Sequence, residues 1–454
     1  MSILSSLHIG SSALKAASTG ISTTSHNVAN AGTEGYSRQT VDQTTSMPIN
    51  TTGLFLGQGV NTDGVSRVAD SLLGLRIVDA TGEASAAEAL HQGLQQVEVY
   101  FNESNGTGFS EAAQEFFDAL SSATSDPSDR SYREAVVAQG QSLAGELNDT
   151  AEGISSTVDG LEESASSLVD EVNELMDELA SINTQVVSSG GASGDLLDRR
   201  DQIVQALAET VGASASIGED GRATVYIGGH AAVSGNTARS LSLGTDDDGN
   251  LTVLLSADNG HVDVTGDLGG TMGGHIEARD LALGYLEKLN EFAVALADAF
   301  NTQHGAGYDL DGNAGGDFFS YDADAAAATI AISSDIADDA DLLAFAGSAT
   351  GGVGDADNLA SLMQLEDEEL LDGLSTRDWL SSLVSEVGGD VAAAESLAES
   401  NGAVLQDLSQ LRESVSGVDL DEEATKLIEF QAAYQAAARV ITATDEMLGV
   451  LMQM

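Results

Sequence analysis

A repeat of apolar side chains near the end of the chain constrains the fold more than any other feature. Residues 417–454 contain no proline, and after Gly417 their only glycine is Gly449. The repeat proceeds in steps of three, four or seven through Leu420, Leu427, Phe430, Tyr434, Ala437, Ile441, Thr444, Leu448 and Leu451. This spacing predicts one long helix with an apolar seam that must pack against a partner. Asp419, three residues before Glu422, resembles a capping box and predicts where the helix begins.

The beginning of the chain carries a matching repeat. Large apolar residues recur every seven positions, at Leu7, Leu14, Ile21 and Val28. Small residues stand three positions after each of them, at Gly10, Ala17, Thr24 and Ala31. Small residues let two helices approach closely, so we expect the two ends to pair as an α-helical coiled coil. In the alternative interpretation each end is an ordinary amphipathic helix on a globular core, which periodicity does not exclude.

The charge of the two ends favours the paired interpretation. Residues 1–33 contain Lys15 and no acidic residue, and residues 425–454 are nearly neutral, whereas the whole chain has a net charge of −57. Exposed helices of so acidic a protein should themselves be acidic. The exception at both ends indicates surfaces that become buried against each other or against other chains.

Composition limits the partners and the habitat. With 73 acidic residues against 16 basic ones, nucleic acid and anionic membranes are poor partners, because their phosphates would be repelled. The 42% apolar residues, in long periodic arrays, argue against disorder in the middle of the chain. Adaptation to high salt explains the acidity better, since the Debye length falls to about 3 Å at 1 M salt. The composition therefore indicates a halophilic host.

Neither a signal peptide nor a membrane span is predicted. The N-terminus lacks a basic region followed by a continuous apolar run, and no apolar run approaches the ~18 residues that a membrane helix needs. Cysteine is absent, which excludes disulfides and thiolate-bound metals. Taken alone, these features predict a cytoplasmic protein.

The middle of the chain is predicted to be mainly helical, with a β insertion. Apolar residues at 154–186 alternate by four and three over more than four heptads, which favours coiled-coil packing. Residues 212–272 consist of short alternating runs separated by Gly, Asp and Asn, and the segment 246–250 (DDDGN) predicts a hairpin turn. A short strand is expected at 328–333, Ser110 is a candidate helix N-cap, and Trp379 is expected in the core.

A basic pair stands out in the helix predicted at 195–211. Arg199 and Arg200 are flanked by Asp195, Asp198 and Asp201. We interpret them as a structural ion-pair cluster, and a contact between subunits is the alternative.

No catalytic, cofactor or metal site is predicted. None of the three lysines follows a glycine, so a phosphate-binding loop is excluded, and no G-x-S-x-G or H-E-x-x-H motif occurs. Asp309, Asp311 and Asn313 alternate as in a calcium loop. However, Ala314 occupies the position that needs glycine, and Ser320 the position that needs glutamate. We therefore expect an ordinary loop, and no enzyme.

Four segments resemble a known family. SSALKAASTGISTTSHNVANAGTEGYSRQ near the start and SGVDLDEEATKLIEFQAAYQAAARVITATDEML near the end resemble the bacterial flagellar axial proteins. GDLLDRRDQIVQALAETVG at 194–212 and GGTMGGHIEARD with LADAFNTQHGAGYDLDGNAGGDFF across 269–319 resemble, more narrowly, the hook-associated protein 1 family of hook–filament junction proteins. The terminal motifs indicate the superfamily, and the internal ones indicate the family.

The resemblance implies a structural component of the flagellum that polymerises through its terminal helices. It implies a terminal coiled-coil domain (1–40 and 415–454, D0), a mainly α body (41–211 and 273–414, D1) and an inserted β domain (212–272, D2). The implied partners are other copies of the chain, the hook protein, the second hook–filament junction protein, the flagellar type III export apparatus and an export chaperone on the C-terminal helix. The implied location is the extracellular flagellum, reached without a cleaved signal peptide. The assembly interface is expected at Leu7, Leu14, Ile21, Val28, Leu420, Leu427, Phe430, Tyr434, Ile441, Leu448 and Leu451.

Three other functions stay open at this point. The chain could be the second junction protein or a flagellin, which should lack the internal motifs. It could be an enzyme of the flagellum such as a wall hydrolase, for which no catalytic domain is visible. A secreted helical adhesin or effector would leave the paired terminal seams unexplained.

Overall fold

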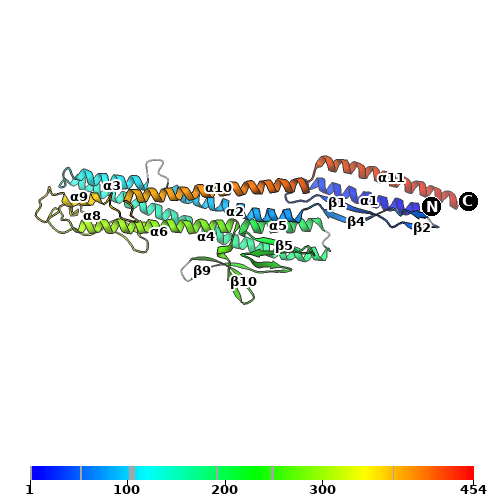
Figure 1. Cartoon of the computed structure of the whole chain (residues 1–454), viewed down its shortest axis with the longest axis horizontal. Helices are drawn as coiled ribbons and strands as arrows, with labels where there is room; N and C mark the ends of the chain where they lie inside the picture. Colours follow the sequence, from blue (N-terminus) through cyan, green and yellow to red (C-terminus); the bar gives the residue numbers. More distant parts are fainter. Residues whose placement is uncertain are drawn as a thin grey trace. The chain divides into compact units, whose positions relative to one another are not determined.

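The computed structural model describes residues 3–51, 54–101, 108–190, 193–246, 250–371 and 373–453. The chain forms two compact units, each assembled from separate segments (Figure 1). Unit 1 comprises residues 1–85, 168–270 and 400–454, and unit 2 comprises residues 86–167 and 271–399. The prediction of a mainly helical protein with a small inserted β region is confirmed.

Helices make up most of the described residues. The α-helices are α1 (Ile3–Ala29), α2 (Ser71–Glu98), α3 (Phe109–Ala123), α4 (Arg130–Ser188), α5 (Gly194–Val211), α6 (Gly270–Gly305), α7 (Ala326–Thr329), α8 (Ser334–Asp338), α9 (Asp357–Gln364), α10 (Thr376–Ser416) and α11 (Leu420–Met452). Single turns of 3-10 helix are η1 (Val99–Phe101), η2 (Thr265–Asp267) and η3 (Ala340–Leu342). The predicted start of the last helix is confirmed: the Asp419 side chain accepts hydrogen bonds from the backbone N–H groups of Asp421 and Glu422.

The strands are short, and all the strand pairs among the described residues are antiparallel. They are β1 (Gln39–Thr45), β2 (Ile49–Thr51), β3 (Leu54–Leu56), β4 (Val60–Arg67), β5 (Ser214–Ile217), β6 (Ala223–Ile227), β7 (His230–Ser234), β8 (Thr237–Ala238), β9 (Leu241–Thr245), β10 (Leu251–Ala257), β11 (Gly260–Asp263), β12 (Phe319–Ser320) and β13 (Ala331–Ile332). In the β insertion they form two sheets, of order β5-β6-β7-β8 and β11-β10-β9.

The β insertion is fixed to α4 by two asparagines within unit 1. The Asn183 side chain exchanges hydrogen bonds with the backbone of Ala223, and Asn173 does the same with Leu241. Strands β9 and β10 form the predicted hairpin, although residues 247–249 of its turn lie outside the described residues. These paired amide contacts hold each sheet in a defined register on the helix.

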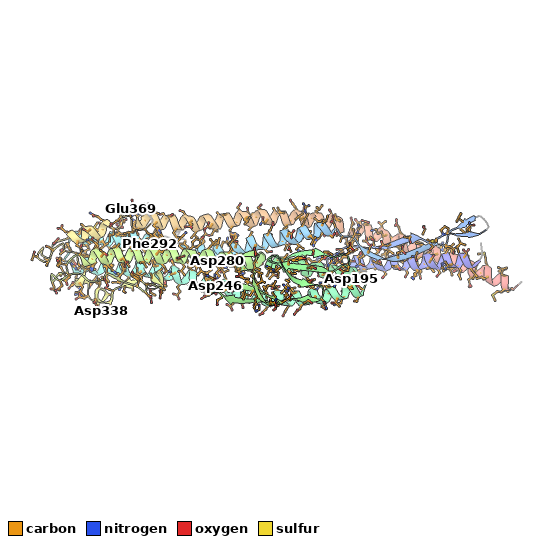
Figure 2. All side chains as sticks on the ribbon, turned by 60° about the horizontal axis from the view of Figure 1, so that its bottom comes forward. Asp195, Asp246, Asp280, Phe292, Asp338 and Glu369 are labelled. Atoms are coloured by element: carbon orange, nitrogen blue, oxygen red, sulfur yellow. The ribbon has the colours of Figure 1, made fainter. Side chains whose placement is uncertain are left out.

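The core of unit 2 is aromatic. Phe116 packs against Phe300 and Phe318. Trp379 is buried and stacks on Phe292 with ring centroids 4.6 Å apart (Figure 2 labels Phe292 on α6). The prediction of a core tryptophan is thus confirmed.

One local prediction is wrong and two are right in part. Ser110 lies inside the first turn of α3, and the cap position is occupied by Gly108. In the segment 328–333 only Ala331–Ile332 is a strand, because the preceding alanines form α7. Along α4 most residues of the 154–186 repeat are buried, but Val169 and Met176 are buried where Leu168 and Leu175 are only half-buried.

Candidate assembly interface

Helices α1 and α11 pack along each other in antiparallel directions (Figure 1). A Cβ atom at Gly10 would lie 2.8 Å from Cγ1 of Ile441, and one at Gly20 would lie 2.6 Å from the ring of Phe430. Real Cβ atoms do not approach other atoms so closely. The two helices therefore reach this separation because glycine occupies both positions.

The small members of the N-terminal repeat form the contact. Gly10, Ala17 and Thr24 are buried. The large members lie at the margins of the contact: Leu7, Leu14 and Ile21 are half-buried and Val28 is exposed. The approach of the helices thus depends on the small residues, and the large ones flank it.

The C-terminal repeat is divided between two surfaces. Leu427, Phe430, Ile441 and Leu448 are half-buried on the side of α1, with Ala437 and Thr444 buried between them. Leu420, Tyr434 and Leu451 are exposed, Tyr434 to 42%. Five further large apolar residues that the repeat did not include are also exposed on α11, namely Ile428, Val440, Met447, Val450 and Met452. The pair therefore leaves a long apolar surface on α11 uncovered.

A buried polar network ties the base of the pair together. The Asn27 side chain donates to Oε2 of Glu423 (2.9 Å) and to the carbonyl of Gln39 (2.9 Å). Its oxygen accepts hydrogen bonds from the Tyr36 hydroxyl (2.8 Å) and from the Gln39 N–H (2.9 Å). Asn27 and Glu423 are each 1% exposed, and Lys426 pairs with Glu423 at 3.0 Å. Asn27 thereby makes four hydrogen bonds, the full capacity of its amide in this arrangement.

Neighbouring charges and burial keep the Tyr36 hydroxyl protonated and the Glu422 carboxyl ionised. Burial, followed by the nearby Asp195, Asp198 and Glu423 carboxylates, raises the pKa of the Tyr36 hydroxyl, so it remains a donor. Glu422 accepts from Lys426 (2.6 Å) and from Arg38 (2.9 Å). Its pKa is lowered by the Lys426 hydrogen bond and charge and then by Arg38.

The start of α5 braces the segment that follows α1. Asp195, labelled in Figure 2, accepts from the Gln39 side chain at 2.7 Å and lies 3.2 Å from the His26 ring. Asp198 is buried; it accepts from Arg67 at 2.8 Å and from the Ser37 N–H. Asp195 and Asp198 therefore fix the segment that connects the terminal helices to the rest of unit 1.

The ion-pair interpretation of this motif is right for one arginine and wrong in detail for the other. Arg200 pairs with Asp201 at 2.5 Å and donates to the Gly221 carbonyl. Arg199 instead pairs with Glu178 on α4 at 2.7 Å. The two side chains point to different neighbours because consecutive residues on a helix do not share a face.

The sequence interpretation missed the polar residues of the interface. Glu423 stands seven residues before Phe430, and Asn27 stands seven residues after Gly20, so both occupy seam positions. A polar residue in an apolar seam is the signal that could have identified them, since such residues fix the register of paired helices.

We searched the described residues for a metal-binding cluster and for a calcium loop. Among them, no three His, Asp or Glu side chains gather in a way that could hold a metal ion. The loop containing Asp309 uses that carboxylate internally, since it accepts from the N–H groups of Asp311 and Asn313. In the part of the chain that the structure describes, no helix has the length and apolarity needed to cross a membrane.

Comparisons with known proteins define first the class and then the family. Residues 7–36 match the family of flagella basal body rod proteins, and residues 410–454 match the C-terminal family of the basal body rod proteins FlgEFG. Both ends of the chain are therefore similar in sequence to flagellar rod proteins. Residues 94–319 match the helical domain of the flagellar hook-associated protein FlgK.

Whole-length relatives agree. The chain is 26% identical to flagellar hook-associated protein 1 of Escherichia coli strain K12, over 97% of this chain and 98% of the relative. It is 29% identical to the protein of the same name from Bacillus subtilis strain 168, over 96% and 95%. The fold matches the flagellar hook junction protein FlgK of Burkholderia pseudomallei with a TM-score of 0.68 and 15% identity, over 75% of this chain and 100% of that one. The chain belongs to the flagellar hook-associated protein 1 family.

Proposed function

We propose that the chain is a structural subunit of the flagellum at the hook–filament junction, where it assembles through its terminal helices. The single observation that carries the assembly mechanism is the apolar surface that the α1/α11 pair leaves uncovered. Tyr434, Val440 and Met447 are large, apolar and exposed in a chain of net charge −57. Exposed apolar surface of this extent marks an interaction site.

The pair α1/α11 is then an antiparallel coiled coil and corresponds to the terminal domain D0. The body D1 (41–211 and 273–414) and the insertion D2 (212–272) make up the rest of the subunit. All eleven predicted interface residues keep their roles in this proposal. Leu427, Phe430, Ile441 and Leu448 hold α1, whereas Leu420, Tyr434 and Leu451 face neighbouring subunits. The chain then has a structural and no catalytic role.

The partners follow from the position in the axial tube. They are further copies of the chain, the hook protein on one side and the second hook–filament junction protein on the other. The subunit reaches the extracellular flagellum through the flagellar type III export apparatus, without a cleaved signal peptide. An export chaperone covers the exposed apolar side of α11 before assembly, because that surface would otherwise aggregate.

The test separates contacts within the chain from contacts between chains. Tyr434→Asp places a charge on the exposed surface, so it should leave the fold intact and abolish filament attachment in a host that lacks its own copy. Leu427→Asp or Ile441→Asp should abolish attachment as well, but with loss of the α1/α11 pair. The matched control is Val353→Asp, at an exposed apolar position of unit 2. Normal filaments in all three α11 variants would contradict the proposal.

We also infer that the protein works in high salt. Its acidic surface is self-repulsive, and salt screens that repulsion. The melting temperature should rise steadily between about 0.1 M and about 2 M sodium chloride, because the Debye length falls over that range. A melting temperature that does not depend on salt would contradict the inference.

A further inference from the structure

A hairpin arm beside α1 combines exposure with an absence of charge. Strands β1 and β4 pair with each other, and β2 pairs with β3 between them. Residues 43–62 contain no charged side chain, although charged residues make up 20% of the chain. An exposed segment without charge is unusual on so acidic a surface and indicates that it becomes covered.

The end of the arm is apolar on both faces. We call Met47, Ile49 and Phe55 the apolar tip; they are 90%, 54% and 70% exposed. Ile49 stands opposite Leu56, and Phe55 stands opposite Asn50. Directly opposite residues share a face, so Ile49 and Phe55 point to different sides of the hairpin. A two-stranded hairpin is only marginally stable alone, so the apolar tip needs a surface that covers it.

The base of the arm is fixed on α1. The Val60 N–H donates to the Ser12 hydroxyl, and Gly59 approaches α1 so closely that a Cβ would collide with Ser12. Gly59 also has φ of +98°, which favours glycine. The helix therefore sets the direction of the arm, while the apolar tip remains exposed.

One flank of α11 offers a complementary surface. Val440, Met447 and Leu451 lie on this flank and are exposed, and residues 430–444 contain Arg439 and no acidic residue. The neighbouring Ile441 contacts Gly10 on α1, so the exposed residues flank the pair within one copy. They present apolar area without the negative charge that covers most of the chain.

We propose that the apolar tip of one copy docks on the flank of α11 formed by Val440, Met447 and Leu451 of a second copy. This inference rests on the proposed function, because it assigns a particular contact to the assembled ring. The proposed assembly brings copies of the chain side by side, and the repulsion between chains of net charge −57 is smallest where both facing surfaces are uncharged. The two surfaces differ, so the contact is head-to-tail and repeats from copy to copy until a ring closes.

Cross-linking in assembled flagella tests the contact. The chain has no cysteine, so Phe55→Cys combined with Val440→Cys introduces one thiol on each surface. A short bis-maleimide should join successive copies into a ladder of multimers, and neither single variant should give one. No ladder from assembled flagella, or dimers from Phe55→Cys alone, would overturn the proposal.

A charge variant provides an independent measurement. Phe55→Asp would place a carboxylate in the contact and should weaken assembly roughly tenfold or more, given the apolar burial lost. Val353→Asp should assemble normally. Full assembly of Phe55→Asp would overturn the docking contact alone. The proposed function has its own readout: gold labelling of the unmodified chain must find it at the hook–filament junction, and labelling elsewhere would overturn the function instead.

Discussion

At the scale of single residues, Asn27 connects three elements of the interface, α1, α11 and β1. Its amide joins α1 to α11 through Glu423 and to β1 through the backbone of Gln39. A buried network of this kind stabilises one arrangement strongly, because every member loses a partner when one is removed.

Replacing Asn27 should therefore loosen the pair. Asn27→Ala leaves the Tyr36 hydroxyl and part of the buried Glu423 carboxylate without partners, at a cost of about 2–4 kcal/mol. Hydrogen exchange of α1 and α11 peptides should become faster, while the fluorescence of Trp379, which reports unit 2, stays unchanged. Gln43→Ala, on exposed β1, serves as the control. Unchanged exchange in Asn27→Ala would contradict the role assigned to the network.

The ion pairs of Glu422 give the pair a defined pH dependence. Because Lys426 and Arg38 hold the pKa of Glu422 below its ordinary value of 4.5, its contribution is present above pH 4.5 and is lost as the pH falls below that value. The stability difference between the wild type and Glu422→Gln should thus vanish in acid. Exchange rates of α11, measured for both proteins across this range, give the difference directly. A difference that persists well below pH 4 would contradict the assignment.

At the scale of elements, the closeness of α1 and α11 is set by glycine. In Gly20→Ala the new Cβ must displace the ring of Phe430. The overpacking should destabilise the pair by about 1–3 kcal/mol, although alanine favours an isolated helix by about 1 kcal/mol. Gly74→Ala on α2, where a Cβ meets nothing within 4 Å, should be neutral or stabilising. Hydrogen exchange of α1 and α11 is compared between the two variants. Equal exchange rates in both would show that the close approach of the helices at Gly20 is not what glycine is needed for.

The elements themselves could be read largely from the sequence. The seven-residue spacing predicted both terminal helices, and Asp419 marked the start of α11. What spacing could not supply was the side of each helix that is covered. Leu427 and Tyr434 occupy equivalent positions in the repeat, yet Tyr434 is exposed, because the extent of burial depends on the partner surface. The polar network escaped prediction for the same reason, since Asn27 and Glu423 are far apart in sequence.

At the scale of the whole molecule, the acidic surface and the nearly neutral ends of the chain have different functions. The acidic surface keeps copies apart in solution. Residues 3–29, 43–62 and 425–453 carry little or no net charge, and many of the exposed large apolar residues lie in these segments. The distribution of charge in the sequence predicted this division for the two ends of the chain but not for the hairpin arm. It could not predict that residues 1–85 and 400–454 share one compact unit with the β insertion, because that depends on contacts between distant segments.

The most direct test of the account is the reactivity of a single thiol at position 434. In Tyr434→Cys the thiol is the only one in the chain, so a maleimide reagent reports its exposure without interference. Val353→Cys shows that the reagent reaches assembled flagella. Assembly through the exposed side of α11 predicts rapid labelling of position 434 in the free subunit and strong protection in the assembled junction. Equal labelling in both states would mean that the exposed side of α11 does not form the assembly interface.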